Sequence, residues 1–535
     1  MSWLVCLLVV WMAVKVAGSS AVPTVAKRHA LSDLSGGFCR NYKFGATIAD
    51  NVLYMVGLDG GIVPDDNDAS HNYLVEVDLA RPVNLRDGSN FKLSLISSDV
   101  PNLKDQALWS NQDNTTLFSY GGRGASNTSA DDGVWTYTVS DGTWELQQTS
   151  VKPVRLSYGA HVDVPEIQAA YWIGGYQSSD TTLSITDDTK VYATGMIQFN
   201  TTTQEFSLLD APFTPVQEGA LVHIPVGELG VLVYFGGEVP SVQSGTNAEL
   251  TPNTWNYVQI YDIASGEWYN QTTTGDVRPR TQFCASVVHD SSSSSFQIYV
   301  ISGADFETQD IITGVSYLSI PSFKWYKAGG LTKGRMTHTC QAYGRQIFGL
   351  GGRQAWADNF TAGCYDTPAF IYDAQSEVVR MDFDPGLSTY SIPSATAEDI
   401  ERSPYPSSWA DPALQALFQV PPEPSWTPAA AAIPRKSKST NTGAIAGGVV
   451  GGIAGVAILL AVIWFIIRSR RRKALQRPEA ASPIPLKSEQ KTDPKEMPVD
   501  DAFGELDERN HARTELGGDT VPVHELDATT MANPR

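Results

Sequence analysis

Five histidines are spread along the chain between residues 71 and 338, and imidazole is the commonest protein ligand for transition metals. They are His71, His161, His223, His289 and His338. A metal site usually shows a local ligand pattern such as H-x-H, H-E-x-x-H or two closely spaced cysteines, and the sequence has none of these. The last four histidines recur once per repeat of a pattern described below. We therefore interpret them as structural and expect no metal or other cofactor.

Other catalytic patterns are also missing from the sequence. There is no G-x-S-x-G, and the glycine-rich "GGRGASNTS" leads into a turn rather than into the helix that a phosphate site needs. Acidic pairs at Asp65–Asp66, Asp131–Asp132 and Asp187–Asp188 could bind a cation or a basic partner, although solvated loop charge explains them better. We assign no catalytic residue.

Two apolar segments predict the topology of the chain. The run "WLVCLLVVWMAV", followed by "AGSSAV", is typical of a secretory signal peptide, which we place at residues 1–21. Gly443–Ile467 carries no charge and is long enough to cross a bilayer as a helix. The "RSRRRK" that follows favours a cytoplasmic C-terminus. We expect a single-pass type I protein of the cell membrane.

Charge excludes one class of partner. The net charge is −20, which gives no electrostatic case for binding DNA or RNA, whose phosphate backbones require clustered Lys and Arg. We expect no nucleic-acid binding.

Cysteines and glycosylation sequons fit an exterior location. Cys6 leaves with the signal peptide, which leaves Cys39, Cys284, Cys340 and Cys364. Four cysteines in an oxidising compartment suggest two disulfides, with three possible pairings, of which Cys340–Cys364 closes the shortest loop. Asn-x-Ser/Thr sequons occur at Asn114, Asn127, Asn200, Asn270 and Asn359.

A repeat organises the region between these features. Apolar runs that end in glycine recur as "LFSYGGR", "AYWIGGY", "LVYFGGE", "IYVISGA" and "IFGLGGR", and "LYMVGLDGG" is a displaced sixth copy. Each of the first five runs is followed by a pair of residues seven positions apart, as in Tyr261 and Trp268 of "IYDIASGEW". Short β-branched and aromatic runs bounded by turn residues predict strands. We expect four strands per unit, with the two members of each pair opposite each other across a hairpin.

These residues resemble the kelch repeat, which forms β-propeller blades. The resemblance covers residues 38–382, is most specific at the Gly-Gly and Trp positions, and weakens where Gly57 stands alone and where Val379 replaces the aromatic residue. The whole layout is similar to fungal membrane-anchored kelch-repeat proteins. The implied fold is all-β, a six-bladed propeller with one transmembrane helix and a disordered tail. How the ring closes is open: residues 24–37, residues after Met381 or a disulfide from Cys39 could close it.

The remaining segments follow from composition. Residues 22–37 are an N-terminal segment, 383–442 are rich in Pro, Ser, Thr and Ala and predict an extended stalk, and 468–535 predict a disordered cytoplasmic tail. Within the membrane segment, Gly447, Gly451 and Gly455 have the small-residue spacing of helix dimers. We expect homodimerisation through this face.

Long connections after the glycine runs indicate where binding occurs. They span Asp59–His71, Gln177–Lys190, Glu238–Asn256 and Arg353–Thr367, and would emerge on one face of a propeller. Arg155, Arg280 and Arg335 precede inner strands and could face the channel or pair with neighbouring blades.

Two functions are compatible with this layout. The first is a non-enzymatic surface protein that binds an extracellular protein or polysaccharide, in recognition, adhesion or cell-wall anchoring. The alternative is an enzyme or enzyme accessory of the secretory pathway, of oxidase or lyase type. Propeller oxidases of the galactose oxidase type need copper held by histidine and tyrosine, a set that the sequence does not bring together, so we favour the first.

Overall fold

The computed structural model describes residues 28–30, 44–57, 72–124, 133–151, 154–214, 216–293, 295–354 and 365–419. All of them belong to one compact unit, Met1–Ser437. The segments expected to be signal peptide, transmembrane helix and cytoplasmic tail lie outside these ranges, as do His71, Cys39 and Cys364. Within the described ranges, no helix has the length and apolar character needed to cross a membrane.

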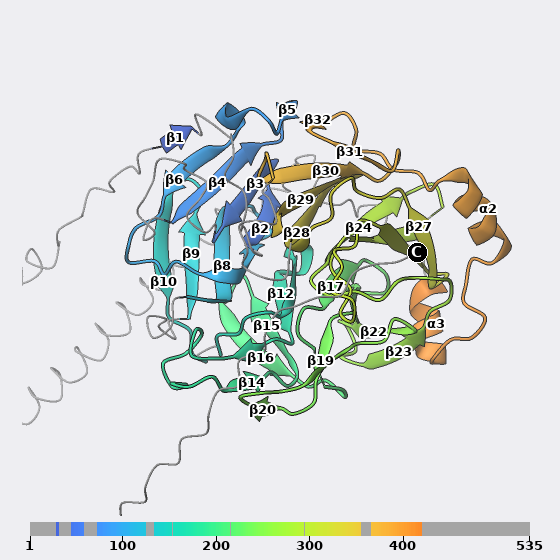
Figure 1. Ribbon diagram of the computed structural model, residues 1–535, viewed down its shortest axis with the longest axis horizontal. Coiled ribbons are helices and arrows are strands. Elements are labelled where there is room, and N and C mark those ends of the chain that lie inside the picture. Colours follow the sequence, from blue (N-terminus) through green and yellow to red (C-terminus); the bar gives the residue numbers. More distant parts are fainter. Residues whose placement is uncertain are drawn as a thin grey trace, which may run out of the picture. The chain divides into compact units, whose positions relative to one another are not determined.

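The described residues form an all-β structure of six main sheets (Figure 1). Sheet 1 contains β1 (Arg28–Ala30), β6 (Lys92–Leu95), β4 (Tyr73–Asp78), β3 (Val52–Val56) and β2 (Gly45–Ala49). Sheet 2 contains β7 (Lys104–Ser110), β8 (Thr116–Arg123), β9 (Val134–Thr138) and β10 (Thr143–Gln147). Sheet 3 contains β11 (Ala160–Val164), β12 (Ala169–Ile173), β15 (Met196–Asn200) and β16 (Glu205–Leu209).

The other three main sheets repeat this order. Sheet 4 contains β17 (Ala220–Ile224), β18 (Val231–Phe235), β22 (Tyr257–Asp262) and β23 (Trp268–Thr272). Sheet 5 contains β24 (Cys284–Asp290), β25 (Ser295–Ile301), β26 (Val315–Ile320) and β27 (Lys324–Ala328). Sheet 6 contains β28 (Met336–Tyr343), β29 (Gln346–Arg353), β30 (Ala369–Asp373) and β31 (Val378–Arg380). Two 3₁₀ turns, Gly88–Asn90 and Pro165–Ile167, lie in connections.

The pairs seven residues apart lie where the sequence predicted them. Tyr261 stands directly opposite Trp268 across β22 and β23, with ring centroids 5.0 Å apart. The same cross-strand register holds for the other four pairs: Tyr137–Trp144, Phe199–Phe206, Leu318–Trp325 and Tyr372–Val379. Directly opposite side chains pack against each other and stabilise the hairpin. The prediction of a hairpin at each pair is confirmed.

The first strands of the six sheets lie side by side in a closed circuit. Strand β2 neighbours β7, and β11, β17, β24 and β28 follow in order until β28 again neighbours β2. Between each neighbouring pair of sheets the described residues form a buried apolar cluster, and there are six such clusters. A four-stranded sheet cannot cover both of its faces alone, so each sheet buries them against its two neighbours.

The glycine pairs make this close packing possible, as Gly174 and Gly175 in sheet 3 show. Both have positive φ, 73° and 77°. A Cβ on Gly174 would lie 2.0 Å from the Val216 carbonyl oxygen of sheet 4, and one on Gly175 would lie 2.1 Å from the Ser157 carbonyl oxygen. The Gly175 amide also donates to Val216 O at 3.1 Å. The glycines thus permit backbone contact within and between sheets, for which any side chain is too large.

Sheets 1 and 6 meet through a segment that follows Met381. Strand β32 (Asp382–Phe383) pairs antiparallel with β5 (Val83–Asn84), which lies in the connection between β4 and β6. Phe383 is 1% exposed and packs among apolar side chains of both sheets. Of the closures left open by the sequence, the segment after Met381 joins the two sheets among the described residues, whereas Cys39 and most of residues 24–37 lie outside them. Residues 28–30 instead extend sheet 1 by pairing with β6.

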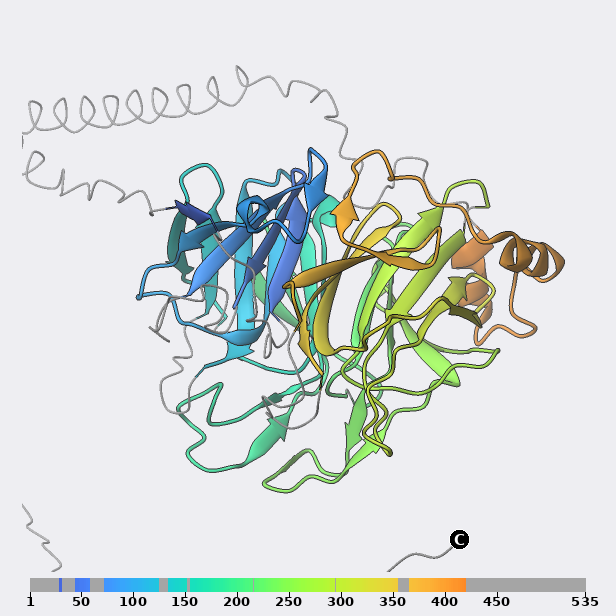
Figure 2. The same ribbon diagram turned by 45° about the horizontal axis from the view of Figure 1, so that its top comes forward.

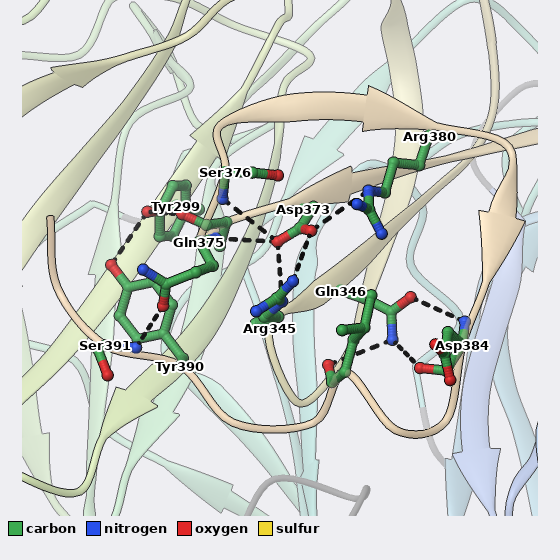
Figure 3. A network of polar contacts seen from close by, with 12 residues as sticks. Tyr299, Arg345, Gln346, Asp373, Gln375, Ser376, Arg380, Asp384, Tyr390 and Ser391 are labelled. Atoms are coloured by element: carbon green, nitrogen blue, oxygen red, sulfur yellow. Dashed lines mark hydrogen bonds and ion pairs between the residues drawn. The ribbon is translucent and has the colours of Figure 1, made fainter.

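The chain after β31 does not begin a stalk at residue 383, contrary to the expectation from composition. Figure 3 shows how its first part is held: Gln346 Nε2 donates to Asp384 O at 2.7 Å, and Tyr390 OH lies 3.1 Å from Tyr299 OH. Nearby, Asp373 receives Arg345 and Arg380 at 3.1 and 3.4 Å (Figure 3). We call residues 382–419 the C-terminal segment.

Two helices of the C-terminal segment pack against the clusters between sheets 5 and 6 and between sheets 4 and 5. Helix α2 (Ser394–Arg402) buries Ile400, and α3 (Pro412–Gln419) buries Leu414 and Phe418. Composition alone did not predict these helices. Their apolar residues are spaced three or four apart, as in "PALQALFQ", but they stand among Pro, Ser and Ala, which suggest an extended segment. Residues 420–442 lie outside the described ranges.

Candidate functional site

A ring of strained residues marks one end of the inner strands. In sheets 2 to 6, one non-glycine residue at the start of the first strand has φ between 54° and 61°. These residues are Asp105, Tyr158, Glu218, Gln282 and Thr337. The left-handed conformation costs about 1–3 kcal/mol for a residue with a side chain, and such positions cluster at functional sites. Each immediately follows a residue that packs against the glycine run of its own sheet.

These residues also contact one another across sheet boundaries. The Glu218 amide donates to Tyr158 O at 2.8 Å, and the Thr337 amide donates to Gln282 O at 2.8 Å. Four of the five are buried, and Tyr158 is half-buried. The ring therefore gathers polar side chains from different sheets at the glycine end of the central axis.

A line of alternating charges and aromatic rings extends outward from this ring. Arg123 Nε lies 2.6 Å from Asp105 Oδ2, and its guanidinium lies 5.0 Å from the centre of the Tyr158 ring. Tyr158 stacks on Tyr176 with centroids 5.1 Å apart, and Lys190 Nζ lies 4.6 Å from the Tyr176 centroid. We call these five residues, together with Glu218 and Glu238, the mouth cluster.

Glu238, in a connection of sheet 4, links the mouth cluster to sheet 5. It is 2% exposed and accepts from Gln217 Nε2 at 2.6 Å and from Thr281 Oγ1 at 2.7 Å. Burial lowers the pKa of Lys190, and the Glu238 carboxylate opposes that shift. The cluster thus carries carboxylates and cations in a protein environment where their charges act over longer distances than in bulk water.

Burial and neighbouring charges shift the pKa values of the cluster residues. Burial raises the pKa of Tyr158, and the charge of Asp105 raises it further. Burial also raises the pKa of Tyr176, with a contribution from Tyr158. For Arg123, burial disfavours the charged form, but Asp105, together with Tyr158 and Tyr176, outweighs burial and the pKa is raised. At neutral pH the tyrosines are hydrogen-bond donors and Arg123 is a fixed cation.

Two of the long connections predicted to bind are ordered and joined beside the mouth cluster. Strands β13 (Tyr176–Gln177), β14 (Lys190–Tyr192) and β20 (Ser244–Gly245) form one small sheet across sheets 3 and 4. Strands β19 (Glu238–Pro240) and β21 (Leu250–Pro252) form a hairpin next to it. Figure 2 shows these segments, in teal and green, extending beyond one end of the main sheets. We call residues 176–192 and 238–252 the loop lobe.

The loop lobe holds its shape through its own hydrogen bonds and exposes two apolar side chains. Tyr192 N donates to Gln243 O at 2.8 Å, which fixes the loop of sheet 3 to that of sheet 4. Leu183 is 56% exposed and Val242 is 47% exposed. Asp187 and Asp188 are exposed, and Asp187 accepts from the Thr189 amide, as solvated loop charge would. The connections 58–71 and 355–364, with Asp65 and Asp66, lie outside the described residues, as do Asp131 and Asp132.

Four of the five histidines between residues 71 and 338 are described, and they lie on the first strands of four different sheets. His161 stacks on Trp172 at 5.5 Å, His289 stacks on Phe296 at 4.5 Å, and His223 lies against Gly230. Burial lowers the pKa of His223 to about 4 and also lowers that of His289. These three rings pack within their own sheets.

The fourth, His338, has a different environment that the sequence did not indicate. Cys284 and Cys340 form a disulfide between β24 and β28, a pairing that is not the shortest loop. His338 lies beside it, and the ligand atoms of the three residues are within 4.8 Å of one another. The only signal in the sequence is the "HTC" of residues 338–340, whose partner lies one repeat away.

Arg280 and Arg335 have a role that differs from the two that the sequence suggested. Arg280 Nη1 donates to Gly314 O at 2.8 Å and to Ser302 O at 3.2 Å, both in its own sheet. Arg335 Nη1 donates to Gly351 O at 2.6 Å, and its guanidinium lies 3.5 Å from the Tyr365 ring centre. They satisfy carbonyls at strand ends. Arg155 is equally buried.

Of the described sequons, Asn270 is exposed, whereas Asn114 and Asn200 are half-buried. Asn114 lies in the turn between β7 and β8, Asn200 ends β15, and Asn270 is exposed on the outermost strand of sheet 4. Asn127, Asn359 and the glycines at 447, 451 and 455 lie outside the described residues.

The chain is similar in sequence to a kelch repeat-containing protein of Arthroderma benhamiae, with 26% identity over 368 residues. The match covers 59% of this chain and 53% of that protein, so the chain spans about half the length of this relative. This similarity confirms the kelch resemblance of the repeats. The solved structure of YjhT aligns with a TM-score of 0.46 and 13% identity, over 65% of this chain and 99% of that one. No protein-family model matches the chain.

Proposed function

We propose that the six sheets are the blades of a six-bladed kelch-type propeller that binds a protein ligand outside the cell through the loop lobe and the mouth cluster. The single observation that carries this proposal is the loop lobe. Two loops from different sheets pair with each other and are held against a buried polar cluster. A loop that only connects strands needs no such organisation, whereas a binding surface gains affinity from being preorganised.

The contacts of the mouth cluster favour a polypeptide over a glycan. Sugars commonly pack their C–H faces on a free aromatic face. The faces of Tyr158 and Tyr176 are already covered by each other, by Arg123 and by Lys190. The exposed Leu183 and Val242 instead offer apolar contacts of the kind that anchor protein interfaces. Polysaccharide remains the second ligand class to be screened.

The test measures binding by the full chain, purified in a mild detergent, against secreted proteins and cell-wall glycans. For a ligand that binds, the double variant Leu183→Asp and Val242→Asp is expected to raise Kd at least about ten-fold, because it places charges in an apolar contact. The matched control is Leu208→Asp, which changes a 73% exposed leucine on β16 outside the loop lobe. If the folded double variant binds as tightly as the control, the loop lobe is not the binding surface.

Anchoring of this propeller as a type I membrane protein is part of the same proposal. It is supported by the uncharged run 443–467 and the basic residues after it. In intact cells, a tag inserted after residue 25 should be accessible to protease and a C-terminal tag should be protected. Protection of both tags would refute the orientation. Gly451→Leu should abolish self-association in a membrane two-hybrid assay if the glycine face forms a dimer.

A further inference from the structure

The two cysteines of the disulfide between sheets 5 and 6 form, together with a nearby histidine, a group of three typical metal ligands. Cys284 is on β24 and Cys340 on β28, with their Cα atoms 5.4 Å apart. His338 is two residues before Cys340 on the same strand, so both side chains can project to the same side. All three are buried, with exposures of 5%, 8% and 1%, and their ligand atoms lie within 4.8 Å of one another.

Two thiolates and one imidazole form a ligand set that zinc uses in proteins. Zinc binds cysteine sulfur at about 2.3 Å and histidine nitrogen at about 2.0–2.1 Å, and tetrahedral geometry separates two sulfurs by about 3.8 Å. Cysteines whose Cα atoms are 5.4 Å apart can reach that separation by side-chain rotation once the sulfur–sulfur bond is open. Three protein ligands leave the fourth tetrahedral position for a water molecule.

The net charge of the complete site favours Zn²⁺ over a monovalent soft ion such as Cu⁺ beside the two cysteines. The cluster lies among apolar side chains of sheets 5 and 6, where an uncompensated charge is costly. Zn²⁺ with two thiolates and a neutral imidazole has no net charge. Cu⁺ with the same ligands would leave one negative charge buried. We propose that reduction of the Cys284–Cys340 disulfide opens a zinc site formed by Cys284, Cys340 and His338.

Opening the zinc site requires a reductant and Zn²⁺. A small dithiol reductant gives two electrons and two protons to the disulfide, becomes a cyclic disulfide, and leaves two cysteine thiols. Zn²⁺ then displaces the two thiol protons and binds both sulfurs together with one nitrogen of His338. In either state, a covalent or coordinate link joins β24 to β28. Sheets 5 and 6 therefore stay cross-linked in oxidising and in reducing compartments.

The experiment uses the full chain in detergent, with Co²⁺ as a spectroscopic substitute for Zn²⁺. The reduced protein should bind one equivalent of Co²⁺ with a thiolate-to-cobalt charge-transfer band, and Zn²⁺ should displace it. The oxidised protein should show no such band. His338→Ala should raise the Co²⁺ Kd at least about ten-fold, and Cys284→Ser should remove the band. Thiol titration then distinguishes bound from free cysteines.

The matched control is His289→Ala, which removes an inner-strand histidine from the same strand as Cys284 and should leave the Co²⁺ Kd unchanged. The urea midpoint of oxidised His338→Ala, compared with that of the unchanged chain, reports whether the variant is folded. The proposal is overturned if the reduced, folded protein binds no stoichiometric Co²⁺, or if His338→Ala binds it as tightly as the unchanged chain does.

Discussion

Replacing Gly175 by alanine tests why a glycine pair ends the second strand of a sheet. The pair could be needed for its positive φ or for the close approach of a neighbouring backbone. Gly175 has φ of 77°, and an added Cβ would lie 2.1 Å from Ser157 O and 2.6 Å from Gly159 N. The left-handed conformation costs an alanine about 1–2 kcal/mol. Moving two backbone atoms out of contact adds about 1–3 kcal/mol, as in other overpacked sites. We expect a total loss of about 2–5 kcal/mol in the free energy of unfolding.

Gly266→Ala provides the control, because Gly266 also has φ of 77° but stands in a hairpin turn. Its Cβ would lie 3.7 Å from Tyr261 OH, an ordinary contact, so only the conformational cost of about 1–2 kcal/mol applies. Urea unfolding of the full chain, followed by tryptophan fluorescence and analysed with a common slope, gives both values. Equal losses in the two variants would show that the pair is needed for its φ alone, and the close-approach argument would be wrong.

Three further predictions concern closure, pH dependence and the C-terminal segment. Phe383→Ala should lower the unfolding free energy by about 3–5 kcal/mol in the same urea assay, since the ring is 1% exposed between sheets 1 and 6; a loss below about 1 kcal/mol would mean that β32 does not hold the ring closed. Asp163 accepts from Ser110 and Thr47 on two neighbouring sheets, and burial raises its pKa. Because its folded-state pKa is above the unfolded value, the contribution of Asp163 to the free energy of unfolding is complete below about pH 4 and is lost as pH rises through the folded pKa. Asp163→Asn should remove that slope from the pH dependence of the unfolding free energy. An unchanged slope would contradict the assignment. Ile400→Ala should cost about 2–5 kcal/mol, whereas Asp399→Asn, which loses a partly exposed 2.5 Å ion pair, should cost under about 1 kcal/mol; the reverse order would show that α2 is held by charge.

The repeating architecture could be predicted from the sequence because its signals are local. A hairpin places residues seven apart opposite each other, and glycine occurs where the end of a second strand comes close to another backbone, so Tyr261, Trp268 and Gly175 are informative in the sequence. The C-terminal segment could not be predicted in this way. Its anchors, among them Phe383 and Ile400, are single apolar residues in a polar background, and their burial depends on surfaces formed by distant strands.

The candidate site was only partly predictable. The sequence indicated that the connections after the glycines carry binding, and two of them form the loop lobe. It gave no sign that Lys190 would pair with Gly245 across sheets, because that register depends on the positions of two sheets rather than on either loop. The cluster of Cys284 and His338 escaped notice for the same reason, since its members come from different repeats.

The left-handed residues at the inner strands indicate that the side chains of the mouth cluster are needed at these positions. Glycine would adopt φ near 58° freely, yet the chain has aspartate, tyrosine and glutamate at three consecutive positions of the ring, each at a cost of about 1–3 kcal/mol. Asp105 recovers part of that cost from Arg123, and Tyr158 from stacking on Tyr176. Strand geometry alone does not require these polar groups at the axis. Under the proposed function, a polar ligand group that approaches from the loop lobe would meet the Arg123 cation, carboxylates and hydroxyl donors.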